Sequence, residues 1–151
     1  MNQKWVAFLR IAIGVFFIAQ GLNKLNWYTT SEFLRTSLDR YAQNPPPAAL
    51  WYQQHVAYPG IEAWSRMIPT GEMLIGVALV LGLLTRAALI AAIALVVNYQ
   101  LTSGTLFAFS FFANPYALVV LSCLFFLLAS RAGSAFSIDG SARKKTSKAK
   151  T

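Results

Sequence analysis

The chain has 151 residues, of which 56% are hydrophobic and only 12% carry a charged side chain. This composition, with a mean hydropathy of +0.50, excludes an ordinary soluble domain and indicates a single integral membrane domain. The lone cysteine, Cys123, excludes an intramolecular disulfide and a Cys-x-x-Cys redox pair. The net charge of +8 is concentrated in the C-terminal segment, where a disordered basic strip beside anionic membrane lipid is favoured over nucleic-acid binding.

Four apolar stretches predict membrane spans at about residues 5–25, 67–84, 87–103 and 115–130. The last two are shorter than the roughly 20 residues that a full crossing needs, so we expect their ends to dip into the bilayer or the bilayer to thin locally. We therefore predict an all-α fold, an integral membrane four-helix bundle over residues 1–132. Residues 133–151 are predicted to form a basic, disordered cytoplasmic tail.

The first two spans each carry charges fourteen residues apart: Arg10 and Lys24 on the first, Glu72 and Arg86 on the second. Fourteen residues of helix cover roughly 21 Å. If the two spans run antiparallel, Arg10 is level with Arg86, and Lys24 is level with Glu72. An acid opposite a base at membrane depth indicates a functional site, although a purely structural ion pair explains the same pattern.

The connection at 26–66 is too long and too mixed in composition for a flexible linker. A first short helix is predicted after Thr29, because Phe33, Leu34, Leu38 and Tyr41 recur at helical spacing. A second is predicted from Ala48 to about Val56, after the three prolines at 45–47. We expect the two helices to form an extracytoplasmic lid between spans 1 and 2.

Most of the basic residues lie on one side of the membrane if both chain termini are on that side. The positive-inside rule then places both termini in the cytoplasm, in a bacterial inner membrane crossed several times. Tryptophans 27, 51 and 64 would lie at the opposite interface, where indole rings favour the level of the lipid head groups. The basic residues counted on the cytoplasmic side are Lys4, Arg10, Arg86, Arg131, Arg143, Lys144, Lys145, Lys148 and Lys150.

Glu72 is the only acidic residue within a predicted span, which makes it the most informative single side chain. Polar residues expected at the same depth could bind carbonyl or anionic oxygens of a small ligand. An interhelical hydrogen-bond network that only fixes the bundle explains them equally well. His55 is the sole histidine and has no ligand partners at suitable spacing, so no metal site is predicted. The candidate ligand-binding residues are Arg10, Gln20, Lys24, Glu72, Arg86 and Asn98; no catalytic residue is assigned.

Three segments carry a resemblance to a known family. The first is Leu9-Arg10-Ile11-x-x-Gly14-x-x-Phe17-x-x-x-Gly21-x-x-Lys24-Leu25, and the second is Gly71-Glu72-x-x-x-Gly76-x-x-Leu79-x-x-Gly82-x-x-Thr85-Arg86. The closing Phe136-Ser137-Ile138-Asp139 is the third. Together they resemble the DoxX family, including the related DoxD-type subunits. The second segment is the most specific of the three.

The resemblance implies a small four-helix bacterial membrane protein, and its DoxD-type members are associated with thiosulfate oxidation coupled to quinone. For this chain it implies a redox-linked membrane subunit without defining a reaction. Together with the charged residues of spans 1 and 2, it leads us to expect a redox-associated subunit that binds quinone or a small oxyanion between these spans, with no covalently bound cofactor. Membrane lipid and other membrane protein subunits are the expected partners. The lack of a cysteine pair argues against direct sulfur exchange. The alternatives are a non-enzymatic structural or assembly subunit and a small transporter, so enzymatic activity stays open.

Overall fold

The computed structural model describes residues 2–114, 117–130 and 137–138, and the ordered elements within them are all helical. The long helices are α1 (Gln3–Leu22), α4 (Ile61–Leu81) and α5 (Thr85–Thr102), with a shorter α7 (Leu118–Ala129). The short elements are η1 (Leu25–Tyr28), α2 (Glu32–Tyr41), α3 (Pro47–Tyr52), the π-helical η2 (Gln53–Ala57), η3 (Thr105–Phe107) and α6 (Ser110–Ala113). Within these residues the predicted all-α fold is confirmed.

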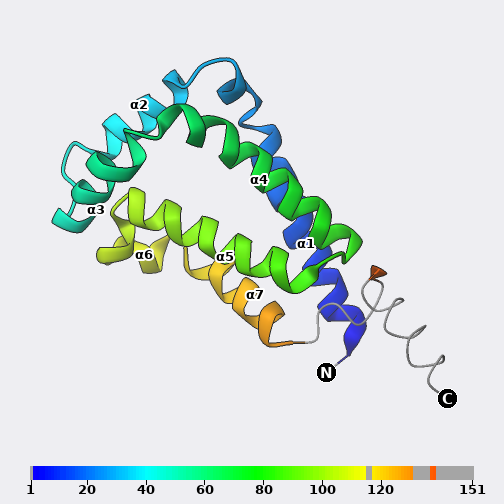
Figure 1. Cartoon of the computed structure of the whole chain (residues 1–151). Coiled ribbons are helices and arrows are strands. Elements are labelled where there is room, and N and C mark those ends of the chain that lie inside the picture. The colour runs from blue at the N-terminus through cyan, green and yellow to red at the C-terminus, as the bar shows by residue number, and fades with distance from the viewer. Residues whose placement is uncertain (1, 115–116, 131–136, 139–151) are drawn as a thin grey trace.

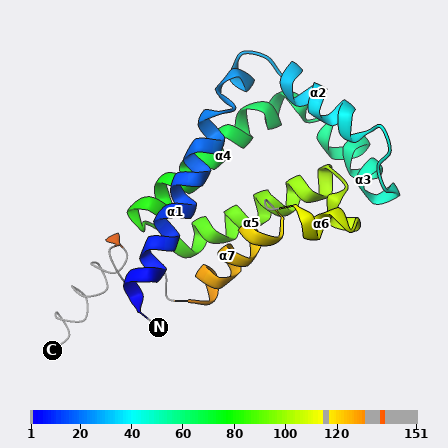
Figure 2. The same cartoon turned by 180° about the vertical axis from the view of Figure 1, so that it is seen from behind.

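Among the described helices, α1 and α4 make the most extensive contact, and they lie side by side along most of their length (Figures 1 and 2). Their backbones approach closely because glycines face each other across the contact. A Cβ added to Gly76 would lie 2.6 Å from the main-chain oxygen of Gly14, and one added to Gly21 would lie 2.9 Å from that of Pro69. Gly14 and Gly21 therefore lie on the face of α1 that contacts α4.

Helices α5 and α7 pack against each other, and α5 also contacts α4 after a tight turn. The turn depends on left-handed backbone conformations at Gly82 (φ 66°) and Leu84 (φ 47°). At Gly82 this conformation costs little free energy, because glycine has no Cβ. Helices α2, α3 and α6 lie at the opposite end of the molecule from this turn (Figure 1). We call these two ends the α2/α3 end and the turn end.

Three helices, α1, α4 and α5, are long and apolar enough to cross a membrane. Their outward faces carry large exposed apolar side chains such as Phe8, Leu74 and Ile90, which water would penalise and lipid would not. The predicted fourth span is only partly realised: α7 has 12 residues, or roughly 18 Å of helix, too short for a full crossing. Residues 115–116, with which that span was expected to begin, lie outside the described part.

The buried apolar side chains divide into two clusters. The larger joins α1, α4, α5 and α7 and includes Phe17, Leu79, Leu89 and Leu124. The smaller lies at the α2/α3 end, where Leu34 and Leu38 of α2 pack with Ala57 and Ile61. The second cluster means that the 26–66 connection has a core of its own, which explains why it is folded.

The two short helices predicted within that connection exist, although the first begins differently from the prediction. It begins at Glu32, three residues after Thr29, and the main-chain N–H of Glu32 donates to the hydroxyl of Thr30 at 3.2 Å. The second helix begins at Pro47 and continues as the π-helical turn η2. Their role as a lid stays a prediction. The predicted tail at 133–151 lies outside the described residues, apart from Ser137 and Ile138.

Candidate functional site

The Lys24–Glu72 pair joins the end of α1 to the middle of α4. The ammonium of Lys24 contacts both carboxylate oxygens of Glu72, at 2.7 and 2.8 Å, and donates a longer bond of 3.3 Å to the main-chain oxygen of Gln20. The Glu72 side chain is 2% exposed and that of Lys24 is 16% exposed. The expectation that these two residues are level is therefore correct, and they meet as a largely buried ion pair.

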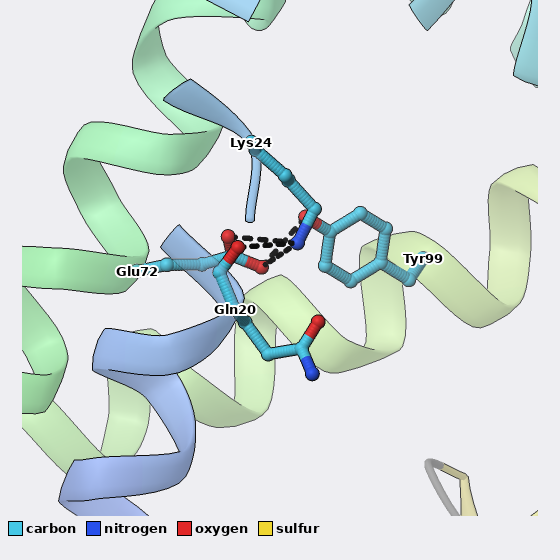
Figure 3. A network of polar contacts seen from close by, with 4 residues as sticks. All are labelled: Gln20, Lys24, Glu72 and Tyr99. Carbon is cyan, nitrogen blue, oxygen red and sulfur yellow. Dashed lines mark hydrogen bonds and ion pairs between the residues drawn. The ribbon is translucent and has the colours of Figure 1, made fainter. Parts of the chain in front are cut away.

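The first predicted span included Lys24, but in the structure Lys24 lies outside α1. The helix ends at Leu22, and Lys24 lies in the turn before η1. Its long side chain reaches back to Glu72 from there (Figure 3). A lysine just past a helix end can extend along apolar surface to a partner one turn away, so a position off the helix costs it little.

Tyr99 of α5 completes the polar group, and sequence reasoning did not select it. Its hydroxyl donates to one oxygen of Glu72 at 2.9 Å, and Figure 3 shows the ring beside Lys24. The ammonium of Lys24 lies 5.5 Å from the centroid of that ring, within cation–π range. The available signal was the polar run 98–100, from which its neighbour Asn98 was chosen. Position 99 faces Glu72 instead.

The remaining predicted site residues are dispersed. Gln20 contributes its main-chain oxygen to Lys24, while its side-chain amide extends away from the ion pair (Figure 3). Asn98 accepts a hydrogen bond from Tyr52 of α3. Arg10 is fully buried near Gly82 at the turn end, where a Cβ on Gly82 would lie 2.6 Å from its Nη1. Arg86 is exposed in the first turn of α5. The two arginines therefore take no part in the Lys24–Glu72 site.

Two pockets border this site. The charged pocket has a volume of about 270 Å³ and contains both members of the ion pair. Apolar side chains of α1, α5 and α7 form much of its wall, with amides and a hydroxyl among them. Its lining residues are Phe16, Phe17, Gln20, Lys24, Tyr41, Glu72, Val96, Tyr99, Gln100, Ser103, Asn114 and Val120.

The aromatic pocket, of about 170 Å³, lies nearer to α2 and α3. It shares Lys24, Tyr41 and Tyr99 with the charged pocket, so these three side chains form a common wall. Its lining residues are Lys24, Trp27, Leu34, Ser37, Leu38, Tyr41, Tyr52, Ala57, Trp64, Ile68, Asn98, Tyr99 and Thr102. Trp27 and Trp64 thus face a pocket, whereas Trp51 is 59% exposed, as a tryptophan at an interface with lipid would be.

Hydrogen bonds fasten the 26–66 connection around the aromatic pocket. Gln53 of η2 donates to the main-chain oxygen of Thr102 at 2.7 Å, and Tyr58 donates to Asp39 at 2.7 Å. Burial, reinforced by the bond to Asp39, raises the pKa of Tyr58 to about 12. Burial also raises the pKa of Tyr52. Both phenols therefore keep their protons at neutral pH and act as donors.

No group of three or more metal-ligating side chains occurs among the described residues. The polar groups of the site offer hydrogen-bond donors, one carboxylate and one ammonium, which suit an organic ligand with oxygen acceptors. The arrangement can hold such a ligand beside a titratable acid.

Comparison with known proteins gives one finding. The DoxX family model matches residues 5–104, which include nearly all of α1, the whole of α4 and α5, and all the residues of the ion-pair site. Neither the curated proteins nor the solved structures compared with the chain gave a match. Because the family match covers about two thirds of the sequence, and because three helices are long and apolar enough to span a bilayer, the chain is a membrane protein that belongs to the DoxX family.

Proposed function

We propose that this protein is a redox-associated membrane subunit that binds the head group of a quinone in the charged pocket. The observation that carries the proposal is the Lys24–Glu72 ion pair, which lies with Tyr99 against a pocket that has largely apolar walls. A buried acid and base at membrane depth are costly, and function is the usual reason for keeping them.

The charge of the site favours a neutral carbonyl ligand over an oxyanion. Glu72 already neutralises Lys24 at 2.7 Å, and an anion beside Lys24 would be repelled by the same carboxylate. A quinone carbonyl needs only one donor. It can replace the longest bond of the ammonium, the 3.3 Å contact with the Gln20 carbonyl, without breaking the ion pair.

Size and access agree with this ligand. A cavity of about 150 Å³ accommodates benzene, so the 270 Å³ of the charged pocket is sufficient for one substituted ring. Phe16 of α1 and Val120 of α7 belong to its wall, and both helices expose apolar residues on their other faces. A ligand dissolved in the membrane could therefore approach between these two helices.

In this proposal Lys24 orients the ring, and Glu72 with Tyr99 holds or passes the proton that a reduced quinone oxygen takes up. In the same proposal, another membrane protein subunit supplies the electrons. The rival function is structural: the ion pair only locks α1 to α4. The same contacts favour that role, so the test must separate the two.

Binding of decylubiquinone distinguishes the quinone-binding function from the structural one. It is measured on the purified protein, alone and with co-purifying subunits. The double variant Lys24→Met/Glu72→Gln removes both charges together and leaves no unpaired ion. We expect it to stay folded and to bind at least tenfold more weakly, a loss of about 1.4 kcal/mol. Lys4→Met, at an exposed lysine, is the matched control and should bind as the parent does. Unchanged affinity in the double variant, or no binding to the parent in either form, would support the structural role.

The positive-inside pattern further supports a bacterial inner-membrane location with both termini in the cytoplasm. In a Cys123→Ser background, a cysteine placed at exposed Lys4 should resist a membrane-impermeant reagent added to intact cells. Rapid labelling there would contradict this orientation.

A further inference from the structure

The aromatic pocket is distinct from the proposed quinone site in the charged pocket. The two pockets are neighbours, because the side chains of Lys24, Tyr41 and Tyr99 line both of them. Glu72 lines only the charged pocket. Five aromatic residues from different elements line the aromatic pocket: Trp27 of η1, Tyr41 of α2, Tyr52 of α3, Trp64 of α4 and Tyr99 of α5. A largely apolar pocket with a few polar groups is the usual form of a small-molecule site.

A cationic ligand does not suit this pocket. Aromatic walls normally attract cations through their ring faces, but Lys24 already provides one. Its ammonium lies 5.8 Å from the ring centroid of Trp27 and 5.5 Å from that of Tyr99. A second positive charge would be repelled by the first.

An anionic ligand is also disfavoured. Lys24 is the only charged side chain among the described residues that line the pocket. Its three protons have acceptors, two on Glu72 and one on the Gln20 main chain. An anion would have to compete with Glu72 for the ammonium and would be repelled by that carboxylate. The electrostatics therefore select a neutral ligand.

The polar groups indicate an oxygen acceptor on that ligand. Tyr52 donates its hydroxyl to the side-chain oxygen of Asn98, and its raised pKa keeps this proton in place. Asn98 can still offer its two amide hydrogens, which are donors, and the second lone pair of its oxygen, so a hydroxyl or carbonyl oxygen on the ligand can accept a hydrogen bond from it. The hydroxyl of Thr102 already donates to the main-chain oxygen of Asn98 at 2.7 Å.

The volume limits the ligand to one ring. At about 170 Å³ the pocket only slightly exceeds the cavity of about 150 Å³ that holds benzene. We propose that the aromatic pocket is a second binding site, for one neutral, monocyclic aromatic compound that carries a hydroxyl or carbonyl oxygen and no tail. This goes beyond the proposed function and does not depend on quinone binding.

Fluorescence quenching by 4-bromophenol tests the site. The chain has four tryptophans, so the variant Trp5→Phe/Trp51→Phe leaves emission only from Trp27 and Trp64, both of which line the pocket. We expect saturable quenching by one equivalent of 4-bromophenol at neutral pH. Two probes of similar size, 4-bromobenzoate and 4-bromobenzylammonium, should bind at least tenfold more weakly to the same protein. Quenching that rises without saturation, or that ignores the charge of the probe, would overturn the proposal.

Two substitutions on α2 provide a matched pair. Ser37 lines the pocket and Thr36 is exposed, and each hydroxyl donates to the main-chain oxygen four residues earlier. Ser37→Leu should fill the pocket and weaken 4-bromophenol binding at least tenfold, whereas Thr36→Leu should leave it unchanged. Equal effects would overturn the proposal.

Independence from the quinone site is measured with both ligands present. Decylubiquinone affinity should be the same in Ser37→Leu as in the parent, and saturating 4-bromophenol should not displace decylubiquinone. If decylubiquinone does not bind at all, the proposed function fails while the quenching result stands. Mutual displacement would mean that one ligand site spans both pockets, and the second-site proposal would be wrong.

Discussion

The two ends of the α1–α4 pair carry charged residues at the same spacing in the sequence, but the structure gives them opposite outcomes. Toward the α2/α3 end, Lys24 and Glu72 form a buried ion pair beside two pockets. At the turn end, Arg10 is buried beside the end of α4, and Arg86 is exposed on α5. Opposite charges at one depth attract, whereas like charges separate unless an acid joins them. Equal spacing therefore predicts depth but does not by itself predict a site.

The largest expected effect comes from breaking the ion pair. Lys24→Met leaves the carboxylate of Glu72, only 2% exposed, without its cation, and should lower the free energy of unfolding in detergent by about 3–5 kcal/mol. Glu72→Gln should cost less, because Lys24 is more exposed and can turn toward water. The double variant should lose less than the sum of the two. Strict additivity in this cycle would mean that the contact contributes no coupling energy.

The arginines at the turn end should differ from each other. Arg10→Gln removes a fully buried guanidinium and its packing near Gly82 and should lower the free energy of unfolding by about 2 kcal/mol. Arg86→Gln, at an exposed position, should change it by less than about 0.5 kcal/mol. Denaturant titrations of both variants in the same detergent measure the difference. Equal losses would mean that Arg86 also contributes to the fold.

A smaller effect tests whether the charges or the close packing hold α1 against α4. Gly76→Ala would place a Cβ 2.6 Å from the main-chain oxygen of Gly14 and should cost about 1–2 kcal/mol as the helices separate. Gly71→Ala, on the same helix with no atom within 4 Å, should be neutral or stabilise by up to about 1 kcal/mol. Thermal unfolding in detergent compares the two. A neutral Gly76→Ala would show that the ion pair alone sets the contact.

The sequence was sufficient for the features that depend on local pattern. Hydropathy located α1, α4 and α5. The fourteen-residue spacing predicted that Lys24 and Glu72 are level, because the rise per residue is constant in any helix. The boundary between the second and third spans was less exact: Arg86 was assigned to the second span, but the turn between α4 and α5 occupies residues 82–84, and Arg86 belongs to α5.

The tertiary structure alone decided which side chains share a site. Adjacent residues on α5 point in different directions, so Tyr99 reaches Glu72 while Asn98 meets Tyr52 at the aromatic pocket. The aromatic pocket is lined by residues of η1, α2, α3, η2, α4 and α5, and no periodic pattern within one element encodes their meeting. Sequence periodicity determines depth and face along one helix. The contacts between helices depend on how close their backbones lie and on the angle at which they diverge. Both are set by the packing of all the helices together.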